Sequence, residues 1–274
     1  MAETDQAKVT LHWLNASRSQ RILWLLTELD VPYDLKFYHR DPKTGLAGAD
    51  LEKVHPLGKS PVITVTPPAA NAGGADAKPI VLAESGFIVE YLCEHWGHGT
   101  DIVPAKWREG REHQVGGETA AWLRYQYLMH YAEGSLMPFL VVYFVFSTLK
   151  SSAVPWFLRP ITSSIANKVS EAYVLPNVHR HLKLLESYLA EPPAASDGTG
   201  YLCGGHLTAA DILLSFPLLS VRERREDLGP WEGGSMDTAY PKLFAYLDRL
   251  EKEPSYQKAV AKIVEVEGSY SVLM

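Results

Sequence analysis

The residues His55-Pro56-Leu57-Gly58-Lys59-Ser60-Pro61-Val62-Ile63 place a proline directly before an apolar run. Because proline has no backbone N–H, Pro61 can stand only at the first position or at the edge of the strand that Val62 and Ile63 predict. The bond between Ser60 and Pro61 is also of the kind that tolerates a cis geometry. A cis bond here would leave the N–H and C=O of Ser60 free to pair with an extended peptide as an added strand.

Lys59 precedes this serine and offers a positive charge for a carboxylate. The segment therefore predicts a binding site for a short acidic peptide. The alternative interpretation is an ordinary turn that leads into a strand and binds nothing.

Two other segments favour the binding interpretation. Upstream lies Leu11-His12-Trp13-Leu14-Asn15-Ala16-Ser17-Arg18-Ser19-Gln20-Arg21, and downstream lies Val81-Leu82-Ala83-Glu84-Ser85-Gly86-Phe87. The three segments, in this order and spacing, resemble the glutathione transferases. The chain looks closest to the fungal and bacterial group with H-W-L-x-x-S-R in the first turn and A-E-S-G-F after the fourth strand. The resemblance covers the whole chain, although its specific motifs lie mostly in the N-terminal part.

The resemblance implies an α/β plus all-α fold: a thioredoxin-like domain with a mixed four-stranded sheet, then an all-helical domain, as in cytosolic glutathione transferases. A length of 274 residues and an apolar fraction of 46% agree with two domains that each have a core. We expect the glutathione-binding domain over residues 1–97, a linker over 98–106 and the helical domain over 107–274.

Hydrophobic periodicity and turn residues predict the elements along the chain. Strands are expected over residues 10–14, 33–38, from 61 onward and 79–82. Helices are expected from 17 to about 30, weakly over 46–54, and over 84–96, 108–149, 161–189, from 208 onward, 240–252 and 254–263. Ser17 with Gln20, and Thr208 with Asp211, have the spacing of helix-capping pairs. Residues 66–76 are rich in Pro, Gly and Ala and predict a surface loop.

Charge and cysteine content exclude several classes of protein. The net charge is −6 without a cluster of Lys and Arg, which argues against nucleic acid as a partner. Cys93 and Cys203 lie far apart and lack CxxC spacing, so we expect buried thiols rather than a disulfide or a metal site. The polar N-terminus has no signal-peptide core, and a cytoplasmic location is expected.

Residues 136–149 are fourteen residues with few polar atoms, and residues 154–158 add apolar side chains in what should be a loop. A membrane span needs roughly 20 apolar residues, and Pro138 and Lys150 interrupt this run. We expect a core helix or the wall of a pocket. The alternative is a weak contact with a membrane surface.

The resemblance implies which residues hold glutathione. Glu84 and Ser85 would bind the α-amino and α-carboxylate groups of the γ-glutamyl unit, the Ser60 backbone the cysteinyl unit, and Lys59 the glycyl carboxylate, with His55 assisting there. Each of these segments also has a plain structural interpretation, because a Ser at a helix N-terminus caps the helix. The predicted binding residues are Lys59, Ser60, Pro61, Glu84, Ser85, His55 and Arg18.

The activity that the resemblance implies, transfer of glutathione to another compound, requires glutathione in its thiolate form. Lowering a thiol pKa of about 8.5 by about two units takes roughly 2.7 kcal/mol, and one hydrogen bond to the charged sulfur supplies about 1.5–3 kcal/mol. Ser17 has the position for this bond, and Asn15 is the next candidate. The alternative role for Ser17 is that of a helix cap. Trp13 stands where tyrosine-using classes carry Tyr. No Cys lies between His12 and Arg21, which disfavours the subfamilies that form a mixed disulfide.

We therefore expect a glutathione S-transferase that uses glutathione as co-substrate and no metal, and the resemblance alone implies a homodimer. It would conjugate glutathione to hydrophobic electrophiles held by the helical domain. A non-catalytic carrier of apolar ligands on the same fold is the alternative. A third interpretation is peroxide reduction or ether cleavage at the same site. The sequence does not identify the electrophile.

Overall fold

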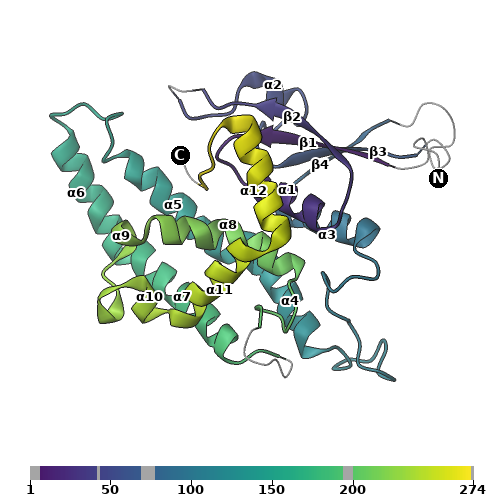
Figure 1. Ribbon diagram of the computed structural model, residues 1–274. Helices are drawn as coiled ribbons and strands as arrows, with labels where there is room; N and C mark the ends of the chain where they lie inside the picture. Colours follow the sequence, from purple (N-terminus) through teal and green to yellow (C-terminus); the bar gives the residue numbers. More distant parts are fainter. Residues whose placement is uncertain (1–6, 42–43, 69–77, 194–199, 273–274) are drawn as a thin grey trace. The chain divides into compact units, whose positions relative to one another are not determined.

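The computed structural model describes residues 7–41, 44–68, 78–193 and 200–272 (Figure 1). The chain divides into two compact units, the first comprising Met1–Val103 with Leu250–Met274 and the second Pro104–Arg249. The expected division into residues 1–97, 98–106 and 107–274 stays a prediction, and the packing adds the C-terminal helix to the first unit. Most of the predicted 66–76 loop falls outside the described residues.

The first unit contains a mixed four-stranded sheet, as predicted. Its strands, in the order β2-β1-β3-β4, are β1 Lys8–Leu14, β2 Tyr33–Tyr38, β3 Val62–Thr66 and β4 Ile80–Ala83. β1 is parallel to β2, whereas β3 is antiparallel to β1 and to β4. In this register His12 pairs with Val62, and Val62 pairs with Ala83. The turn after β1, the entry to β3 and the exit of β4 therefore meet at one end of the sheet.

The described residues of this unit also form the helices α1 Ser19–Glu28, α2 Ala49–Glu52, α3 Ser85–Trp96 and α12 Pro254–Glu267. Figure 1 shows α1 and α3 on one side of the sheet and α2 on the other. α1 packs against α3 and α12, and for this reason Ile22 to Leu26 are buried on every side. The indole of Trp24 donates a hydrogen bond of 2.9 Å to Ser255, which ties α12 to α1.

The predicted capping pair of Ser17 and Gln20 is wrong. α1 begins at Ser19, and no side chain caps it. The reason is the turn at Ala16, whose φ of 43° places Ser17 ahead of the helix. The side-chain nitrogen and oxygen of Gln20 are buried without a hydrogen-bond partner in the described part of the chain.

The second unit is helical, as expected. Its first long helix is α4 Ala120–Tyr131, continued by a π-helical turn, Ala132–Leu136, and by α5 Met137–Thr148. Its second is α6 Arg159–Val169, a π-helical turn Ser170–Val174 and α7 Leu175–Ala190. The remaining helices are α8 Ala209–Glu223, α9 Arg225–Leu228, a 3-10 turn Glu232–Gly234, α10 Met236–Ala239 and α11 Pro241–Lys252, whose end belongs to the first unit.

The helix expected from residue 108 begins only at Ala120. Residues 108–119 form turns instead, in which Gly110, His113 and Gly116 adopt positive φ angles that an α-helix excludes. By length and composition alone, the continuous helix Ala120–Thr148 is long and apolar enough to cross a membrane, and 44% of its most apolar window is buried.

The expectation of a core position for residues 136–158 holds only for part of them. Met137, Leu140 and Tyr143 are buried. Trp156 and Phe157, at 79% and 61% exposure, lie at the surface, so for them the expectation is wrong. These two residues belong to the loop between α5 and α6, where no other described element covers them.

The capping pair at the start of α8 is confirmed. Thr208 and Asp211 form a reciprocal capping box. Asp211 is fully buried and also accepts hydrogen bonds from the Leu202 N–H at 3.1 Å and the Tyr246 hydroxyl at 2.8 Å. This carboxylate therefore joins three segments of the second unit.

His12 on β1 predicts a pH-dependent stability. Its ring nitrogens lie 3.0 Å from the Tyr38 hydroxyl and 2.8 Å from the Thr64 hydroxyl. Burial, and then the charge of Lys36, lowers the His12 pKa. The unfolded chain therefore binds a proton at His12 more readily than the folded chain does. The stabilisation that neutral His12 gives the folded chain is complete above pH 6.5 and is lost as the pH falls through the folded pKa.

We expect the free energy of unfolding to fall between pH 7.5 and 5 (about the range of a histidine) more steeply in the native chain than in His12→Gln. Urea unfolding at several pH values measures both slopes. Equal slopes for the two proteins would contradict this role of His12.

Candidate functional site

The three segments singled out in the sequence meet at one depression in the first unit. Seven of the nine predicted site residues line it, together with Leu57 and Ala83. The seven are Arg18, His55, Lys59, Ser60, Pro61, Glu84 and Ser85. The register of β1, β3 and β4 brings them together, because each segment lies at the same end of the sheet.

The peptide bond between Ser60 and Pro61 is cis. β3 begins two residues later, at Val62, and within the described ranges no backbone group is hydrogen-bonded to the N–H or C=O of Ser60. An extended peptide could pair with both groups. This is the arrangement that the proline before the apolar run predicts.

Glu84 and Ser85 form the turn from β4 into α3. Glu84 has a φ of 73° and a ψ of 119°, a conformation that a non-glycine residue adopts only under strain, and such residues concentrate at functional sites. The Ser85 hydroxyl is buried and accepts a hydrogen bond of 3.0 Å from Arg21. Because a hydroxyl has one proton, Ser85 keeps that proton for an acceptor such as a carboxylate.

Arg21 is a site residue that the sequence reasoning missed. It lies in the middle of an apolar helix and is fully buried, where arginine is rare. A charged residue inside the apolar face of α1 was the available signal.

The turn after β1 holds Ser17 in contact with this depression. The Ser17 hydroxyl oxygen lies 3.1 Å from that of Ser60, and Ser60 also hydrogen-bonds Ser19. Ser17 donates to the Leu14 carbonyl at 2.7 Å and accepts from the Ser19 N–H at 3.1 Å. The Ser17 oxygen is thus fixed, and its proton can turn toward another acceptor by rotation about the C–O bond.

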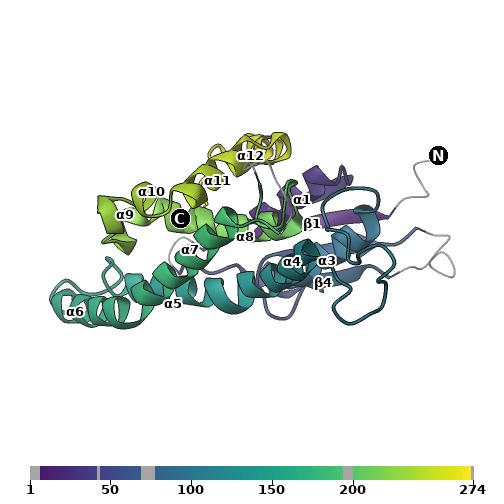
Figure 2. The ribbon, with the colours of Figure 1, turned by 90° about the horizontal axis from the view of Figure 1, so that it is seen from below.

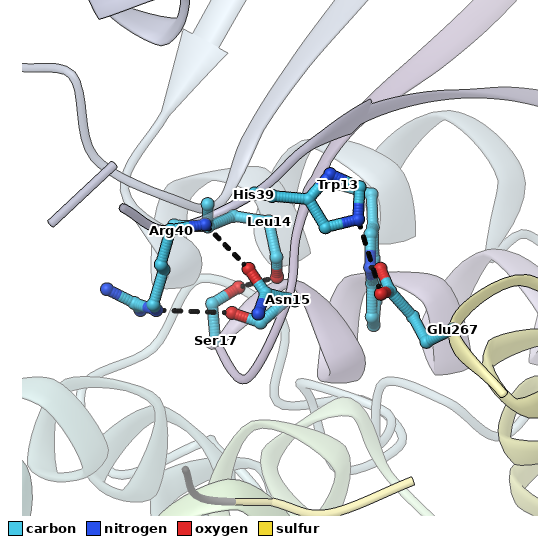
Figure 3. Close-up of polar contacts among 7 residues, drawn as sticks. All are labelled: Trp13, Leu14, Asn15, Ser17, His39, Arg40 and Glu267. Atoms are coloured by element: carbon cyan, nitrogen blue, oxygen red, sulfur yellow. Dashed lines mark hydrogen bonds and ion pairs between the residues drawn. The ribbon is translucent and has the colours of Figure 1, made fainter. Parts of the chain in front are cut away.

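Asn15 occupies the other side of the same turn (Figure 3). Its Oδ1 accepts a hydrogen bond of 2.9 Å from the Arg40 N–H, and its carbonyl accepts one of 3.2 Å from the Arg40 guanidinium. Because a backbone N–H can only donate, these contacts fix which atom of the amide is oxygen. The guanidinium also donates to Ala16 and Gly45, so Arg40, which the sequence reasoning missed, holds the turn together.

A second cavity of about 250 Å³ lies beside this turn. It is lined by Trp13, Asn15, Ser17, Gln20 and residues at the end of α12, including Glu267. Ser17 thus lines this cavity and touches Ser60 of the first depression.

The indole N–H of Trp13 is already hydrogen-bonded within the protein. It donates a hydrogen bond of 2.8 Å to Glu267, whose carboxylate also lies 3.4 Å from His39 (Figure 3). The Trp13 N–H is therefore engaged by Glu267 and is not available as a donor to a bound ligand. Glu267 is far away in the sequence, and no local pattern could have identified it.

The depression has mixed charge. Arg18 and Lys59 line it, Arg40 lies behind the turn, and Glu84 supplies a carboxylate. Burial, and secondly the charge of Arg18, lowers the Arg40 pKa. Such a site suits a ligand that carries both carboxylates and an ammonium group.

The two cysteines of the chain do not contribute a reactive thiol to this site. Cys93 and Cys203 are free and buried, and burial raises the pKa of Cys93 to about 12. A thiol with that pKa is not a nucleophile at neutral pH. Among the described residues, no group of three His, Cys, Asp or Glu could hold a metal ion.

Comparison with known proteins decides the family. The profile of the glutathione S-transferase N-terminal domain matches residues 17–95, and that of the C-terminal domain matches residues 150–262. Glutathione S-transferase 1 of Saccharomyces cerevisiae is 32% identical over 254 residues, which cover 93% of this chain and 94% of the relative. The chain belongs to the glutathione S-transferase family.

Solved structures agree with this family. A glutathione S-transferase from Actinobacillus pleuropneumoniae is 26% identical, with a TM-score of 0.63, and the match covers 96% of this transferase and 95% of that chain. A sphingomonad glutathione S-transferase complexed with glutathione has a TM-score of 0.58 at 20% identity, with 92% and 98% coverage. At that identity the second comparison supports the fold alone.

Proposed function

We propose that this transferase binds glutathione in the depression between Arg18, Ser60 and Ser85 and activates its thiol for attack on hydrophobic electrophiles. The observation that carries the proposal is that seven residues from three distant segments line one site. A relative of the same fold was solved with glutathione bound.

Each part of glutathione has a partner of matching chemistry in this proposal. The Ser85 hydroxyl and the N-terminus of α3 bind the α-carboxylate of the γ-glutamyl unit, and Glu84 binds its ammonium. The Ser60 backbone, directly before the cis bond to Pro61, pairs with the cysteinyl unit. Lys59 binds the glycyl carboxylate, and His55 and Arg18 line the same depression.

Ser17 is our proposed donor to the thiolate. A cysteinyl unit paired with Ser60 brings its sulfur close to the Ser17 hydroxyl, because the two serine oxygens are 3.1 Å apart. Asn15 remains the second candidate, since its Oδ1 is held by Arg40 and its Nδ2 has no partner among the described residues. No acid–base residue or metal is required: thiolate stabilisation and proximity supply the rate.

The electrophile would enter beside Ser17. The cavity of about 250 Å³ there has room for a small electrophile and includes the apolar side chains of Trp13 and Ile263. We also predict that side chains of the helical unit line the acceptor site. We further infer a cytoplasmic homodimer, in line with the free buried thiols of Cys93 and Cys203.

Turnover tests this function against a carrier role. The purified protein should be retained on immobilised glutathione and should conjugate glutathione to an aryl halide. Retention without any turnover of aryl halides, peroxides or aryl ethers would favour a carrier of apolar ligands. Turnover of peroxides or ethers alone would assign a different reaction to the same site.

Lys59→Ala should raise the KM for glutathione about 1.5- to 5-fold and leave kcat unchanged. The reason is that a solvent-exposed pair of a lysine and a carboxylate contributes about 0.2–1 kcal/mol. Lys78→Ala, at another exposed lysine of the first unit, is the matched control. An unchanged KM in Lys59→Ala would remove this lysine from the site.

A further inference from the structure

The loop between α5 and α6 presents large apolar side chains to solvent. Trp156 is 79% exposed and Phe157 61%. Exposed apolar residues continue at a spacing of four along both helices of the hairpin, at Val141 and Val145 on α5 and at Ile161 and Ile165 on α6, each between 46% and 61% exposed. Residues four apart lie on one face of a helix.

Contacts within the hairpin join its two helices and its tip. α5 and α6 lie side by side in Figures 1 and 2 and pack against each other. The Thr162 hydroxyl donates to the Leu149 carbonyl at 2.7 Å, and Arg159 donates to the Val154 carbonyl at 3.1 Å. The backbone N–H of Leu158 bonds to Pro155, which turns the chain at the tip. The apolar tip is therefore held in place rather than collapsed onto the protein.

The charge of this region differs from that of the chain as a whole. From Gly134 to Ser170 the sequence has no Asp or Glu, whereas Lys150, Arg159 and Lys168 are basic. The whole chain carries a net charge of −6. Lys150 flanks the exposed tip, and Lys168 lies in the last turn of α6, at the end of that helix away from the tip.

An exposed Trp-Phe tip flanked by Lys150, on a hairpin whose only charged residues from Gly134 to Ser170 are basic, has the chemistry of a surface that inserts at a lipid interface. Aromatic rings partition to the headgroup level of a bilayer. Nearby basic residues are attracted to anionic lipids. A second copy of this chain would carry the same positive charge on the same face, so the charges favour an anionic partner over self-association.

We propose that the α5–α6 hairpin docks the protein on anionic membrane surfaces, with Trp156 and Phe157 entering the interface. Such docking would concentrate the protein where apolar compounds accumulate. It is independent of glutathione binding, because all its residues lie in the second unit and none lines the glutathione depression.

Co-sedimentation of the full chain with vesicles tests the docking. The protein should sediment with vesicles of phosphatidylcholine and phosphatidylserine, and less with phosphatidylcholine alone. Trp156→Ser/Phe157→Ser should weaken the partition constant about tenfold or more, because the variant loses the two aromatic side chains that enter the membrane interface. Lys150→Gln/Lys168→Gln should weaken it about tenfold, and only at low salt.

The matched control is Val115→Ser/Leu123→Ser, which removes two exposed apolar side chains elsewhere in the second unit. It should bind vesicles as the native chain does. Failure of the native chain to sediment with anionic vesicles, or equal binding by the native chain and the tip variant, would overturn the proposal. So would a tip variant that turns a dimer into a monomer in sedimentation velocity while vesicle binding stays unchanged, because the tip would then be a contact between copies.

Discussion

Ser17→Ala should lower kcat for conjugation of an aryl halide about 10- to 150-fold, with a small change in the Kd for glutathione. The factor follows from the loss of one hydrogen bond to a charged sulfur, about 1.5–3 kcal/mol. The ground-state thiol gains much less from this bond than the thiolate does, so binding of glutathione changes little. Steady-state kinetics together with calorimetry separates the two effects.

Two further variants keep this prediction specific. Ser17→Thr retains a hydroxyl and should recover most of the lost kcat. Asn15→Ala removes the acceptor for the Arg40 N–H at 2.9 Å and should lower stability by about 1 kcal/mol, with a smaller effect on kcat. If Asn15→Ala instead lost more activity than Ser17→Ala, the thiolate donor would be Asn15. Equal losses of kcat and of glutathione affinity in Ser17→Ala would assign Ser17 a structural role.

Asp211→Ala should destabilise the second unit by about 3–5 kcal/mol. Its carboxylate accepts hydrogen bonds from the Thr208 N–H at 2.8 Å, the Thr208 hydroxyl, Leu202 and Tyr246. The substitution leaves these buried donors without partners and removes the cap of α8. Each unsatisfied buried group costs about 1–3 kcal/mol, and the costs are not additive.

Denaturant unfolding followed by circular dichroism measures this loss. Asp248→Ala is the matched control, because that carboxylate is half exposed and pairs with Arg222 at 3.1 Å. An exposed ion pair contributes only about 0.2–1 kcal/mol. A loss in Asp211→Ala no greater than that in Asp248→Ala would show that the buried network does not support the fold.

Local patterns predicted the sheet and most helices. Alternation over Tyr33–Tyr38 and the proline before Val62 identified two strands, and Thr208 with Asp211 identified the start of α8. The helix expected from residue 108 failed, because His113 and the neighbouring glycines take positive φ angles that no hydrophobic period encodes.

The binding residues were predictable from short motifs, but the residues that hydrogen-bond to them were not. Ser85 could be recognised at the start of a helix, whereas its partner Arg21 is far away in the sequence. Trp13 was visible in the first motif, but its bond to Glu267 depends on the packing of α12 against the sheet unit. Contacts between distant segments depend on tertiary packing, which periodicity along one chain does not describe.

We propose that glutathione lies along Ser60 with its sulfur at Ser17. Titration of the bound thiol by ultraviolet absorbance, at saturating protein, tests it most directly. We predict one glutathione per chain and a thiol pKa about two units below the usual value of about 8.5. A bound thiol with an unshifted pKa, or no binding of glutathione at all, would contradict it.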